Sequence, residues 1–381
     1  MKGIYIARVR NYEEVNLGVI KKCLGQQEAF INFGIEVDLI WWGEFGIYRN
    51  DELIKEIDLT QYGSKVYLLY NYMYKFYKAL DEFIDFNYID FIYMRYELSH
   101  PLLVRFLKKA KKHNKNLIIF IEIPTYPYRR EFENLEKKLL LLLDVLFRGK
   151  LFKYVDRIVH FGALKFIYST PTIIIGNGIS NKIEKIAKPC LDVNSLNLIA
   201  VGNWNNWHGL DRLISGIFNY YNEGYGSCMV KLKIVGGGES LREYRKQVKN
   251  LKLENYVQFT GPLAEKELDE VFDEMDMGIG NLALHRTGLD LAFPLKHREY
   301  CMRGLPFVLS THDPDFNKDL DFVFYLECND LPVNIHELIL IKKRFSKDIS
   351  HRSLIQNFAL NNLTWSKKFE PVFNELVKLQ Y

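Results

Sequence analysis

The sequence is poor in cysteine, with five cysteines in 381 residues. Their number is odd, they are widely scattered, and no two have the C-x-x-C spacing, so they do not suggest a disulfide framework. We therefore expect reduced thiols and a cytoplasmic protein. The five positions are Cys23, Cys190, Cys228, Cys301 and Cys328.

Long hydrophobic stretches are also lacking. Apolar runs such as Leu139–Leu143 and Leu117–Ile121 are far shorter than the roughly 18–20 residues that cross a bilayer. The first residues, MKGIYIARVR, do not contain the sustained apolar core of a signal peptide. We expect neither a signal peptide nor a membrane span, so any membrane contact would be peripheral, at the inner membrane face.

The net charge is small, because 51 Lys and Arg stand against 47 Asp and Glu, for a formal charge of +4. This balance gives little reason to expect a nucleic-acid partner. Basic residues do gather in the segment 108–115, at the end of an expected amphipathic helix. The cations there either complement the helix macrodipole or form a patch that contacts anionic lipid.

The length and the pattern of hydrophobic runs predict two α/β domains. A single core rarely grows beyond roughly 250–300 residues. Short runs rich in Ile, Val and Phe alternate with amphipathic segments, which is typical of strand–helix repeats in parallel sheets. The first repeat is a strand over 3–9, a helix over 19–33 and a strand over 35–42. Further strands are expected over 66–70, 89–94, 117–123, 156–161, 172–176, 196–202, 230–236, 256–261, 276–282, 306–310 and 322–326.

A polar segment over 180–195 separates the two halves of this pattern. We predict an N-terminal Rossmann-like domain over 1–185 and a C-terminal one over 196–362. An amphipathic helix over 363–381 follows the second domain and could cross back to the first. No G-x-G-x-x-G follows the first strand, which argues against a nicotinamide-dependent oxidoreductase.

Glycines stand where several of the expected strands end. Gly18 precedes the first helix, Gly202 and Gly209 bracket the loop after strand 196–202, and Gly236–Gly238 follows strand 230–236. In parallel sheets, ligands bind at the carboxyl ends of the strands, where glycine lets the backbone approach a phosphate. Many such glycines serve only as turns or caps, so this signal is weak by itself.

The segment 294–308, PLKHREYCMRGLPFV, concentrates charge in one turn before an apolar strand. Lys296 and Arg298 could face a diphosphate, and Glu299 could accept hydrogen bonds from ribose hydroxyls. A salt-bridged surface helix is the alternative. We favour the binding interpretation, because the segment precedes a strand of the second sheet.

The order of these motifs resembles the family-four, or group-one, glycosyltransferases. The resemblance runs through IGNGI (175–179), IVGGGES (234–240), FTGPLAEKEL (259–268), EYCMRGLPFV (299–308) and the closing LTW helix. It spans nearly the whole chain. It implies a GT-B fold, with two Rossmann-like parallel-sheet domains facing a cleft, and a retaining, metal-independent transfer.

The resemblance also assigns residues to the donor. It places Gly18 against the donor phosphates and implies that Glu299 holds the ribose. Gly238, in the glycine run after strand 230–236, is a further candidate donor contact. Three positions depart from the family's pattern: Leu291 stands where its first glutamate is expected, and the loop after strand 196–202 has Asn203 and His208 in place of an arginine and a lysine. His208 could donate to a phosphate or stack on a neighbouring tryptophan as a structural residue.

These departures increase the importance of the remaining cations, since a departing nucleoside diphosphate develops charge. We predict Arg286 and Lys296 as catalytic residues, with Arg298 as a further donor contact. Arg286 lies just beyond strand 276–282, where it would face the cleft or remain an exposed loop charge.

The segment 122–131, EIPTYPYRRE, follows a strand of the first domain and has the composition of an acceptor site. Aromatic rings suit sugar faces, so Tyr126 and Tyr128 would pack on the acceptor while Glu122 orients its hydroxyl. A proline-rich loop with tyrosines packed for stability is an equal alternative.

The sequence therefore predicts transfer of a hexose-type sugar from a UDP- or GDP-linked donor, without a cofactor, to a glycan or lipid-linked glycan acceptor. Surface polysaccharide assembly is a plausible setting. Two alternatives remain. Leu291 prompts a catalytically silent donor-binding partner of another transferase, and a GT-B sugar-nucleotide epimerase would need paired carboxylates and histidines.

Overall fold

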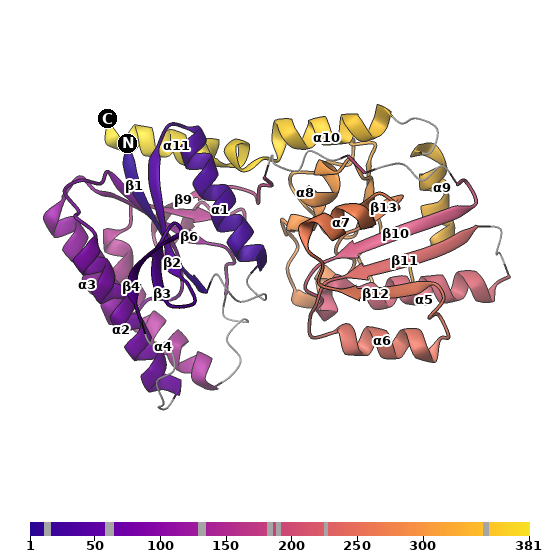
Figure 1. Cartoon of the computed structure of the whole chain (residues 1–381), viewed down its shortest axis with the longest axis horizontal. Coiled ribbons are helices and arrows are strands. Elements are labelled where there is room, and N and C mark those ends of the chain that lie inside the picture. The colour runs from indigo at the N-terminus through magenta and orange to yellow at the C-terminus, as the bar shows by residue number, and fades with distance from the viewer. Residues whose placement is uncertain are drawn as a thin grey trace. The chain divides into compact units, whose positions relative to one another are not determined.

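The computed structural model describes residues 1–10, 17–57, 65–128, 135–180, 186–187, 192–224, 228–345 and 350–381. The chain divides into two compact units (Figure 1). The first comprises Met1–Gly176 and Trp365–Tyr381, and the second comprises Asn177–Thr364.

The described strands of the first unit form one nine-stranded sheet, ordered β4-β3-β2-β1-β5-β6-β7-β9-β8. The strands from β2 to β9 in this order are parallel, and the edge pairs β2–β3, β3–β4 and β8–β9 are antiparallel. The strands are β1 (Lys2–Arg10), β2 (Glu36–Trp42), β3 (Gly46–Arg49), β4 (Glu52–Glu56), β5 (Phe91–Arg95), β6 (Ile118–Ile123), β7 (Arg157–His160), β8 (Phe166–Ile167) and β9 (Thr170–Ile174).

Helices cover both faces of this sheet (Figure 1). Alternate strand residues face opposite layers: Ile92 and Met94 join the apolar cluster under α2, α3 and α4, whereas Tyr93 contacts Phe30 and Phe369 of α1 and α11. The helices are α1 (Leu17–Asn32), α2 (Lys65–Phe83), α3 (Pro101–His113), α4 (Leu135–Leu151) and α11 (Trp365–Gln380), with the 3-10 turn η3 (Phe152–Tyr154).

The last helix of the chain, α11, packs on α1 in the first unit. The rings of Phe33 and Phe373 stack with centroids 4.5 Å apart, and Arg157 forms an ion pair with Glu375. At Gly25, a Cβ atom would lie 2.0 Å from the Trp365 ring, so only glycine permits this approach of the two helices.

The expected strand over 66–70 is wrong, because these residues belong to helix α2. A five-residue apolar run fits a strand or a buried helical turn equally well. The decisive signal lies further along, where Met73, Phe76, Tyr77 and Leu80 are buried at helical spacing. The hairpin of β3 and β4 was not expected.

The second unit has a six-stranded, fully parallel sheet in the order β12-β11-β10-β13-β14-β15. Four of these strands lie within predicted runs, and β10 and β11 each begin one residue before theirs, so the expectation of two parallel-sheet α/β halves is confirmed. The strands are β10 (Ser195–Val201), β11 (Met229–Val235), β12 (Val257–Gly261), β13 (Met277–Ile279), β14 (Phe307–Leu309) and β15 (Val323–Tyr325).

Two layers of helices cover this sheet. Leu198 joins the cluster with α5 and α9, while its neighbour Ile199 joins the cluster with α7, α8 and α10. The helices are α5 (Leu210–Asn222), α6 (Leu241–Asn250), α7 (Glu265–Phe272), α8 (Leu295–Met302), α9 (Ile335–Phe345) and α10 (Ser350–Asn362), with 3-10 turns η4 (Asn206–His208) and η5 (Leu284–Thr287).

The strand order of the second unit reverses next to β10. From β10 the chain proceeds to β11 and β12 on one side, and then to β13, β14 and β15 on the other. The loops on the two sides of such a reversal diverge and leave a crevice at the carboxyl ends of the strands. This edge is where a ligand site is expected.

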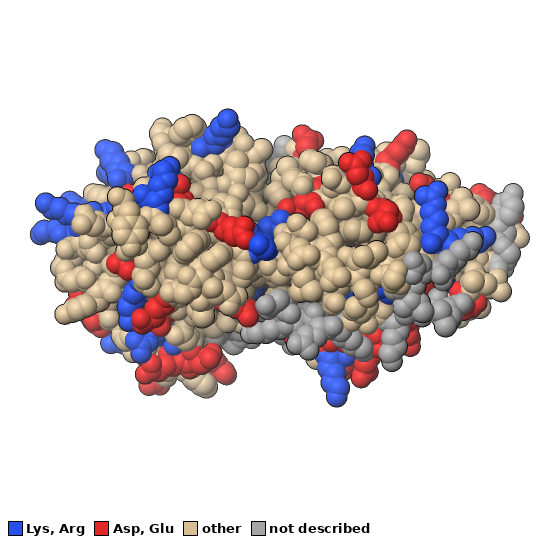
Figure 2. Space-filling view, turned by 90° about the horizontal axis from the view of Figure 1, so that it is seen from above, with Lys and Arg blue, Asp and Glu red and all other residues tan. Residues whose placement is uncertain are grey.

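The described surface has no dominant charge of one sign on the face in Figure 2. Lys and Arg side chains alternate with Asp and Glu over a largely uncharged surface on each unit. None of the described helices is both long and apolar enough to span a membrane.

Candidate active site

The loops after β10 and β11 are in direct backbone contact at the strand-order reversal. Gly202 donates its N–H to the Val235 carbonyl, at 3.1 Å. Gly236 has a φ of +111°, and a Cβ atom there would lie 2.0 Å from the Gly202 carbonyl oxygen. Gly238 has a φ of +130° and would bring a Cβ to 2.2 Å from the Trp204 nitrogen. The glycines are therefore required for the two loops to meet.

The buried side chain of Trp204 holds the loops after β10 and β11 together. It is completely buried, and its indole Nε1 donates to the Val235 carbonyl at 3.1 Å. Its backbone N–H donates to Gly237, at 2.7 Å, and its carbonyl accepts from Ser240, at 3.1 Å. The ring is thus held in one orientation beneath the loops.

Lys296, in the first turn of α8, extends its ammonium over the Trp204 ring, 4.5 Å from the centroid. A Cβ placed on Gly202 would lie 3.6 Å from Nζ. The side chain is only 7% exposed, and Nζ has no hydrogen-bond partner among the described residues. Burial lowers the pKa of Lys296 to about 7, although the charge of Glu299 opposes that shift.

Glu299 follows Lys296 by one helical turn. Its side chain is partly exposed, and no described residue donates a hydrogen bond to its carboxylate. A buried lysine and a partly exposed carboxylate, neither with a hydrogen-bonded side-chain partner in the described chain, therefore lie on one face of α8. Such a pair suits a ligand that has an anionic group next to hydroxyls.

His208, in η4, lies beside the same tryptophan. Its ring is 5.2 Å from Trp204 and 5.8 Å from Trp207, centroid to centroid. Burial and the nearby charge of Lys296 lower the pKa of His208 to about 2, so the imidazole is neutral. Nδ1 lies 2.9 Å from the Asn205 nitrogen and 3.2 Å from the Asn205 carbonyl oxygen, so it accepts from the N–H when the ring proton is on Nε2 and donates to the carbonyl in the other tautomer. The ring meets Trp204 edge-on and is tilted against Trp207, and it can donate from Nε2 in the tautomer that carries its proton there.

The second unit matches a known family, and the whole chain matches solved structures. Residues 195–325 match the model of the family described as glycosyl transferases group 1. Sucrose-phosphate synthase from Thermosynechococcus elongatus is 12% identical, with a TM-score of 0.64, over 99% of both chains. The catalytic domain of starch synthase IV from Arabidopsis thaliana is 10% identical, with a TM-score of 0.65, over 100% of this chain and 99% of that one. No curated protein matches the chain.

A glycosyltransferase from Rickettsia africae is a further similar structure, 10% identical with a TM-score of 0.63, over 99% of this chain and 98% of that one. The chain is a glycosyltransferase of the GT-B fold. The segment that matches the family model contains Trp204, His208, Lys296 and Glu299, so the geometry described above belongs to the glycosyltransferase domain itself.

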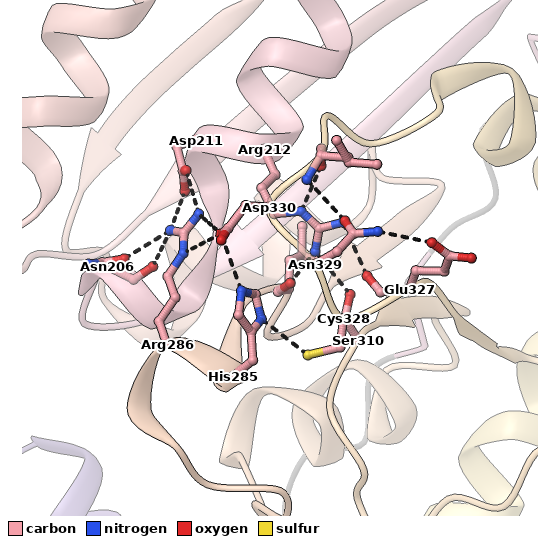
Figure 3. A network of polar contacts seen from close by, with 12 residues as sticks. Asn206, Asp211, Arg212, His285, Arg286, Ser310, Glu327, Cys328, Asn329 and Asp330 are labelled. Carbon is pink, nitrogen blue, oxygen red and sulfur yellow. Dashed lines mark hydrogen bonds and ion pairs between the residues drawn. The ribbon is translucent and has the colours of Figure 1, made fainter.

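In this glycosyltransferase, Arg286 does not face open space as a donor for a diphosphate. Its guanidinium forms two hydrogen bonds with Asp211, at 2.9 and 2.8 Å, and pairs with Asp330 at 2.7 Å (Figure 3). It also donates to the carbonyl and the side chain of Asn206, both at 2.9 Å. Arg286 therefore joins η5 to η4 and α5. These contacts occupy the guanidinium and favour a positioning role, while the catalytic role of Arg286 stays a prediction.

All contacts of the Arg298 guanidinium in the described chain are with the protein itself. This corrects its assignment as a donor contact. It is completely buried and forms ion pairs with Asp313 and Asp315. Its Nε donates to the Asn177 carbonyl at 3.1 Å. Asp313 also accepts from His297, at 2.9 Å. Among the described residues, no group of three or more His, Cys, Asp or Glu is placed to hold a metal ion.

Three other predicted donor residues are placed as follows. Asn203 is exposed in the loop after β10, and Gly238 lies in the loop after β11. Gly18 is exposed in the first turn of α1, and a Cβ there would have no heavy atom within 4 Å. The geometry brings Asn203 and Gly238 to the edge where Lys296 lies.

Glu122 was expected to orient an acceptor, but the structure buries it completely. Lys22 and Arg95 pair with its carboxylate at 3.0 and 2.8 Å, and the Tyr93 hydroxyl donates to it at 2.8 Å. Burial alone would raise the pKa of Glu122, but the charges of Lys22 and Arg95 outweigh it and hold the pKa below its ordinary value. The carboxylate therefore balances two cations in the first unit.

The two predicted acceptor tyrosines differ. Tyr128 is 6% exposed, and its hydroxyl bonds to Asp144 at 2.7 Å and to Tyr168 at 2.6 Å, so it has a packing role. Tyr126 is partly exposed, and its ring meets those of Tyr168 and His160 edge-on. Tyr126 thus remains the candidate for sugar contact. The rest of the predicted segment, 129–131, lies outside the described residues.

Sequence reasoning did not assign Trp204 to the site. The only signal for it was an aromatic residue two positions after the loop glycine Gly202, in a loop that contains two tryptophans. Asp211 was also missed, because nothing in the sequence indicates that it lies opposite Arg286. Both residues position others, and such roles depend on contacts that are distant along the chain.

Proposed function

We propose that this glycosyltransferase moves a hexose-type sugar from a UDP- or GDP-linked donor to a hydroxyl of a glycan or lipid-linked glycan acceptor. The anomeric configuration would be retained, and neither a metal nor a cofactor would be used. The nucleotide sugar binds to the second unit, at the carboxyl ends of β10 and β11. A role in surface polysaccharide assembly, in the cytoplasm at the inner membrane face, fits this chemistry.

The buried amino group of Lys296, which has no hydrogen-bond partner in the described chain, is the observation that carries the proposal. Charging this buried group is costly, which is why its pKa is lowered to about 7, and a ligand that supplies the missing partners would favour the charged form. The three N–H groups of Nζ need anionic acceptors, and a diphosphate provides several oxygens within one small group. The Trp204 ring stabilises the charged form of the side chain through a cation–π contact.

Neighbouring groups supply the rest of the donor site. The neutral His208 can donate its Nε2 proton to a phosphoryl oxygen, at the position where the family has a lysine. Glu299 can accept from the ribose hydroxyls. The glycines of 236–238 allow the backbone to approach the phosphates without a side chain in the way.

In the proposed reaction, the bond between the anomeric carbon and the β-phosphate oxygen breaks while a bond to the acceptor oxygen forms on the same face. The acceptor proton passes to the departing diphosphate. Negative charge grows on that diphosphate, and Lys296 and His208 are fixed before the reaction begins, so they stabilise the transition state more than the ground state.

Calorimetric titration with UDP-glucose and GDP-mannose tests the donor site. Lys296→Met keeps an unbranched side chain one atom shorter and removes the charge, and we expect it to weaken binding of the preferred donor by about a hundredfold, as for a lost charge-assisted contact of ~2–3 kcal/mol. The matched control is Lys246→Met, on the exposed surface of α6. Equal affinity of both variants would reject the site.

The same titration addresses the catalytically silent alternative that Leu291 suggests. A silent partner would bind the donor but would not turn it over. It would show no hydrolysis of the donor, not even a slow one, and no transfer of the sugar to any acceptor. Release of nucleoside diphosphate by the wild-type protein, lost in Lys296→Met, is the expected result. Interconversion of the donor sugar without an acceptor would instead indicate an epimerase.

A further inference from the structure

Helix α4 of the first unit exposes a stripe of aliphatic side chains. Leu139, Leu142, Val145 and Leu146 are 46%, 55%, 42% and 59% exposed. Leu142 follows Leu139 by three residues, and Val145 and Leu146 follow Leu142 by three and four, so the four side chains lie on one side of the helix. Scattered exposed leucines are ordinary on a soluble protein, but four on adjacent turns of one helix form a continuous apolar surface.

The opposite side of α4 is held by the protein. Asp144 is completely buried and accepts from the Tyr128 hydroxyl, at 2.7 Å, and from the Ser99 N–H, at 2.8 Å. Leu140 and Leu141 pack against the core of the first unit. These contacts fix the rotation of the helix, so the aliphatic stripe faces outwards as a consequence of how α4 is anchored.

Lysines flank the stripe at both ends. Lys138 lies at its beginning, Lys150 at its end, and Lys153 follows in η3, all three exposed. Between residues 138 and 153 the one acidic residue is Asp144, which is buried. The outward face of this described segment therefore combines aliphatic side chains with positive charge and has no carboxylate.

The basic segment 108–115 is a weaker candidate for membrane contact than the sequence implied. Lys109 pairs with Asp81 at 3.2 Å, and Lys111 pairs with Asp156 at 2.8 Å, so two of its cations are neutralised. None of the large apolar side chains that are exposed in the described chain lies between 102 and 115. Without apolar groups, this segment could offer only electrostatic attraction.

We propose that α4 docks the enzyme on an anionic lipid surface, with its aliphatic stripe inserted at the level of the headgroups and its lysines paired with lipid phosphates. An amphipathic surface of this kind binds membranes by burying apolar area and attracting anionic lipid. A zwitterionic surface would satisfy only the first of these forces, so the charge of the lipid should matter.

This docking would also bring the acceptor side of the first unit to the membrane. Arg148 of α4 lies over the Tyr168 ring, 4.8 Å from its centroid, and Tyr168 is the residue that Tyr126 meets edge-on. The helix that would touch lipid thus borders the aromatic cluster that is the candidate for sugar contact. In this respect the inference rests on the proposed function, because it takes the acceptor to be lipid-linked.

Co-sedimentation of the full chain with vesicles tests the proposal. The probes are vesicles of phosphatidylcholine alone and of phosphatidylcholine with phosphatidylglycerol at two parts to one. We expect wild type to bind the anionic vesicles. Leu142→Ser with Leu146→Ser, and separately Lys138→Glu with Lys150→Glu, should each reduce the bound fraction by about tenfold or more.

Two control pairs match these changes elsewhere. Leu354→Ser with Leu360→Ser alters exposed leucines of α10, and Lys108→Glu with Lys112→Glu alters exposed lysines of the segment 108–115. Both controls should bind as wild type does. The proposal fails if wild type does not bind, if the α4 variants bind normally, or if the control at 108 and 112 alone abolishes binding.

Two further measurements keep the outcome clear. Donor affinity and melting temperature of the α4 variants should equal those of wild type, so a loss of vesicle binding cannot be confused with misfolding or with failure of the donor site. If wild type is a dimer and Leu142→Ser with Leu146→Ser makes it monomeric without a change in vesicle binding, the stripe is an interface between copies, and the membrane proposal is overturned.

Discussion

Lys296 and Trp204 form a buried cation–π pair, in which the ammonium lies 4.5 Å from the ring centroid and has no hydrogen-bond partner in the described chain. A fully satisfied lysine would show carbonyl or carboxylate oxygens around Nζ. Here the tryptophan stabilises the charge from one side only. The pair exists in the unliganded protein, but the contacts of the charged lysine are complete only when an anion binds.

The first prediction is that donor affinity depends on pH through Lys296. Its pKa in the unliganded protein is lowered to about 7, and a bound diphosphate would hold the amine in its charged form. Binding then takes up a proton above pH 7, so affinity should fall by up to about tenfold per pH unit as the pH rises beyond 7. Titrations between pH 6 and pH 9 measure this slope.

Calorimetry in buffers of different ionisation enthalpy should detect the same proton uptake. Lys296→Met should remove the slope, whereas Lys246→Met should keep it. An affinity of the wild-type protein that stays constant over this range would mean that Lys296 does not contact the diphosphate.

The second prediction is that Lys296→Met stabilises the unliganded protein. Methionine fills the same space without a charge to desolvate, so we expect the free energy of unfolding to rise by about 1–3 kcal/mol at pH 7. Between about pH 7 and 10.5, Lys296 is protonated in the unfolded chain but not in the folded protein. Wild-type stability should therefore rise with pH over this range, and this rise should be absent from the variant. Denaturant unfolding at several pH values provides the comparison. A loss of stability would show that Nζ supports the fold.

Short runs of Ile, Val and Leu predicted the strands of the second unit well, because each is bounded by glycine or a polar turn and is too short for a helix. The same rule failed for 66–70, where a five-residue run is only the start of helix α2. The periodicity of apolar residues distinguishes a helix from a strand when it is followed over several turns. The helical spacing of the buried residues from Met73 to Leu80 would have corrected the strand assignment of 66–70.

The segment 294–308 shows why a local sequence pattern does not assign roles to individual residues. It indicated that Lys296, Arg298 and Glu299 belong together, but not which of them faces the ligand. Residues two apart on a helix point in nearly opposite directions, and only the distant position of Asp313 shows that Arg298 turns inwards. Roles that depend on such remote partners are not encoded in local spacing.

The third prediction contrasts two neighbouring glycines. Gly238→Ala places a Cβ 2.2 Å from the Trp204 nitrogen at a φ of +130°, whereas a Cβ on Gly237 would meet no heavy atom within 4 Å. We expect Gly238→Ala to reduce the free energy of unfolding by roughly 1–3 kcal/mol and to displace Trp204, with a loss of donor affinity. Thermal unfolding should separate the two variants, and equal melting temperatures would contradict the close contact of the two loops.

The fourth prediction is that Arg286 acts through Asp211. If Arg286 positions the loop of η4, then Arg286→Ala and Asp211→Ala should raise the KM for the donor to a similar extent, with little change in kcat. The double variant should be no worse than either, which corresponds to a coupling of about 0.5–2 kcal/mol for this partly exposed pair. A large fall in kcat for Arg286→Ala alone would restore the catalytic role that the sequence suggested.

The fifth prediction concerns Glu122, the buried carboxylate between Lys22 and Arg95. Glu122→Gln would leave two cations beside a neutral amide, so the free energy of unfolding should fall by about 3–5 kcal/mol, whereas the exposed control Glu52→Gln should change it by less than about 0.5 kcal/mol. Because the folded pKa of Glu122 lies below its ordinary value, its stabilisation is complete above the ordinary pKa and is lost as the pH falls through the folded one. Wild type should therefore lose stability in acid more steeply than Glu122→Gln. A variant that keeps full stability but loses acceptor affinity would show instead that this carboxylate faces the substrate.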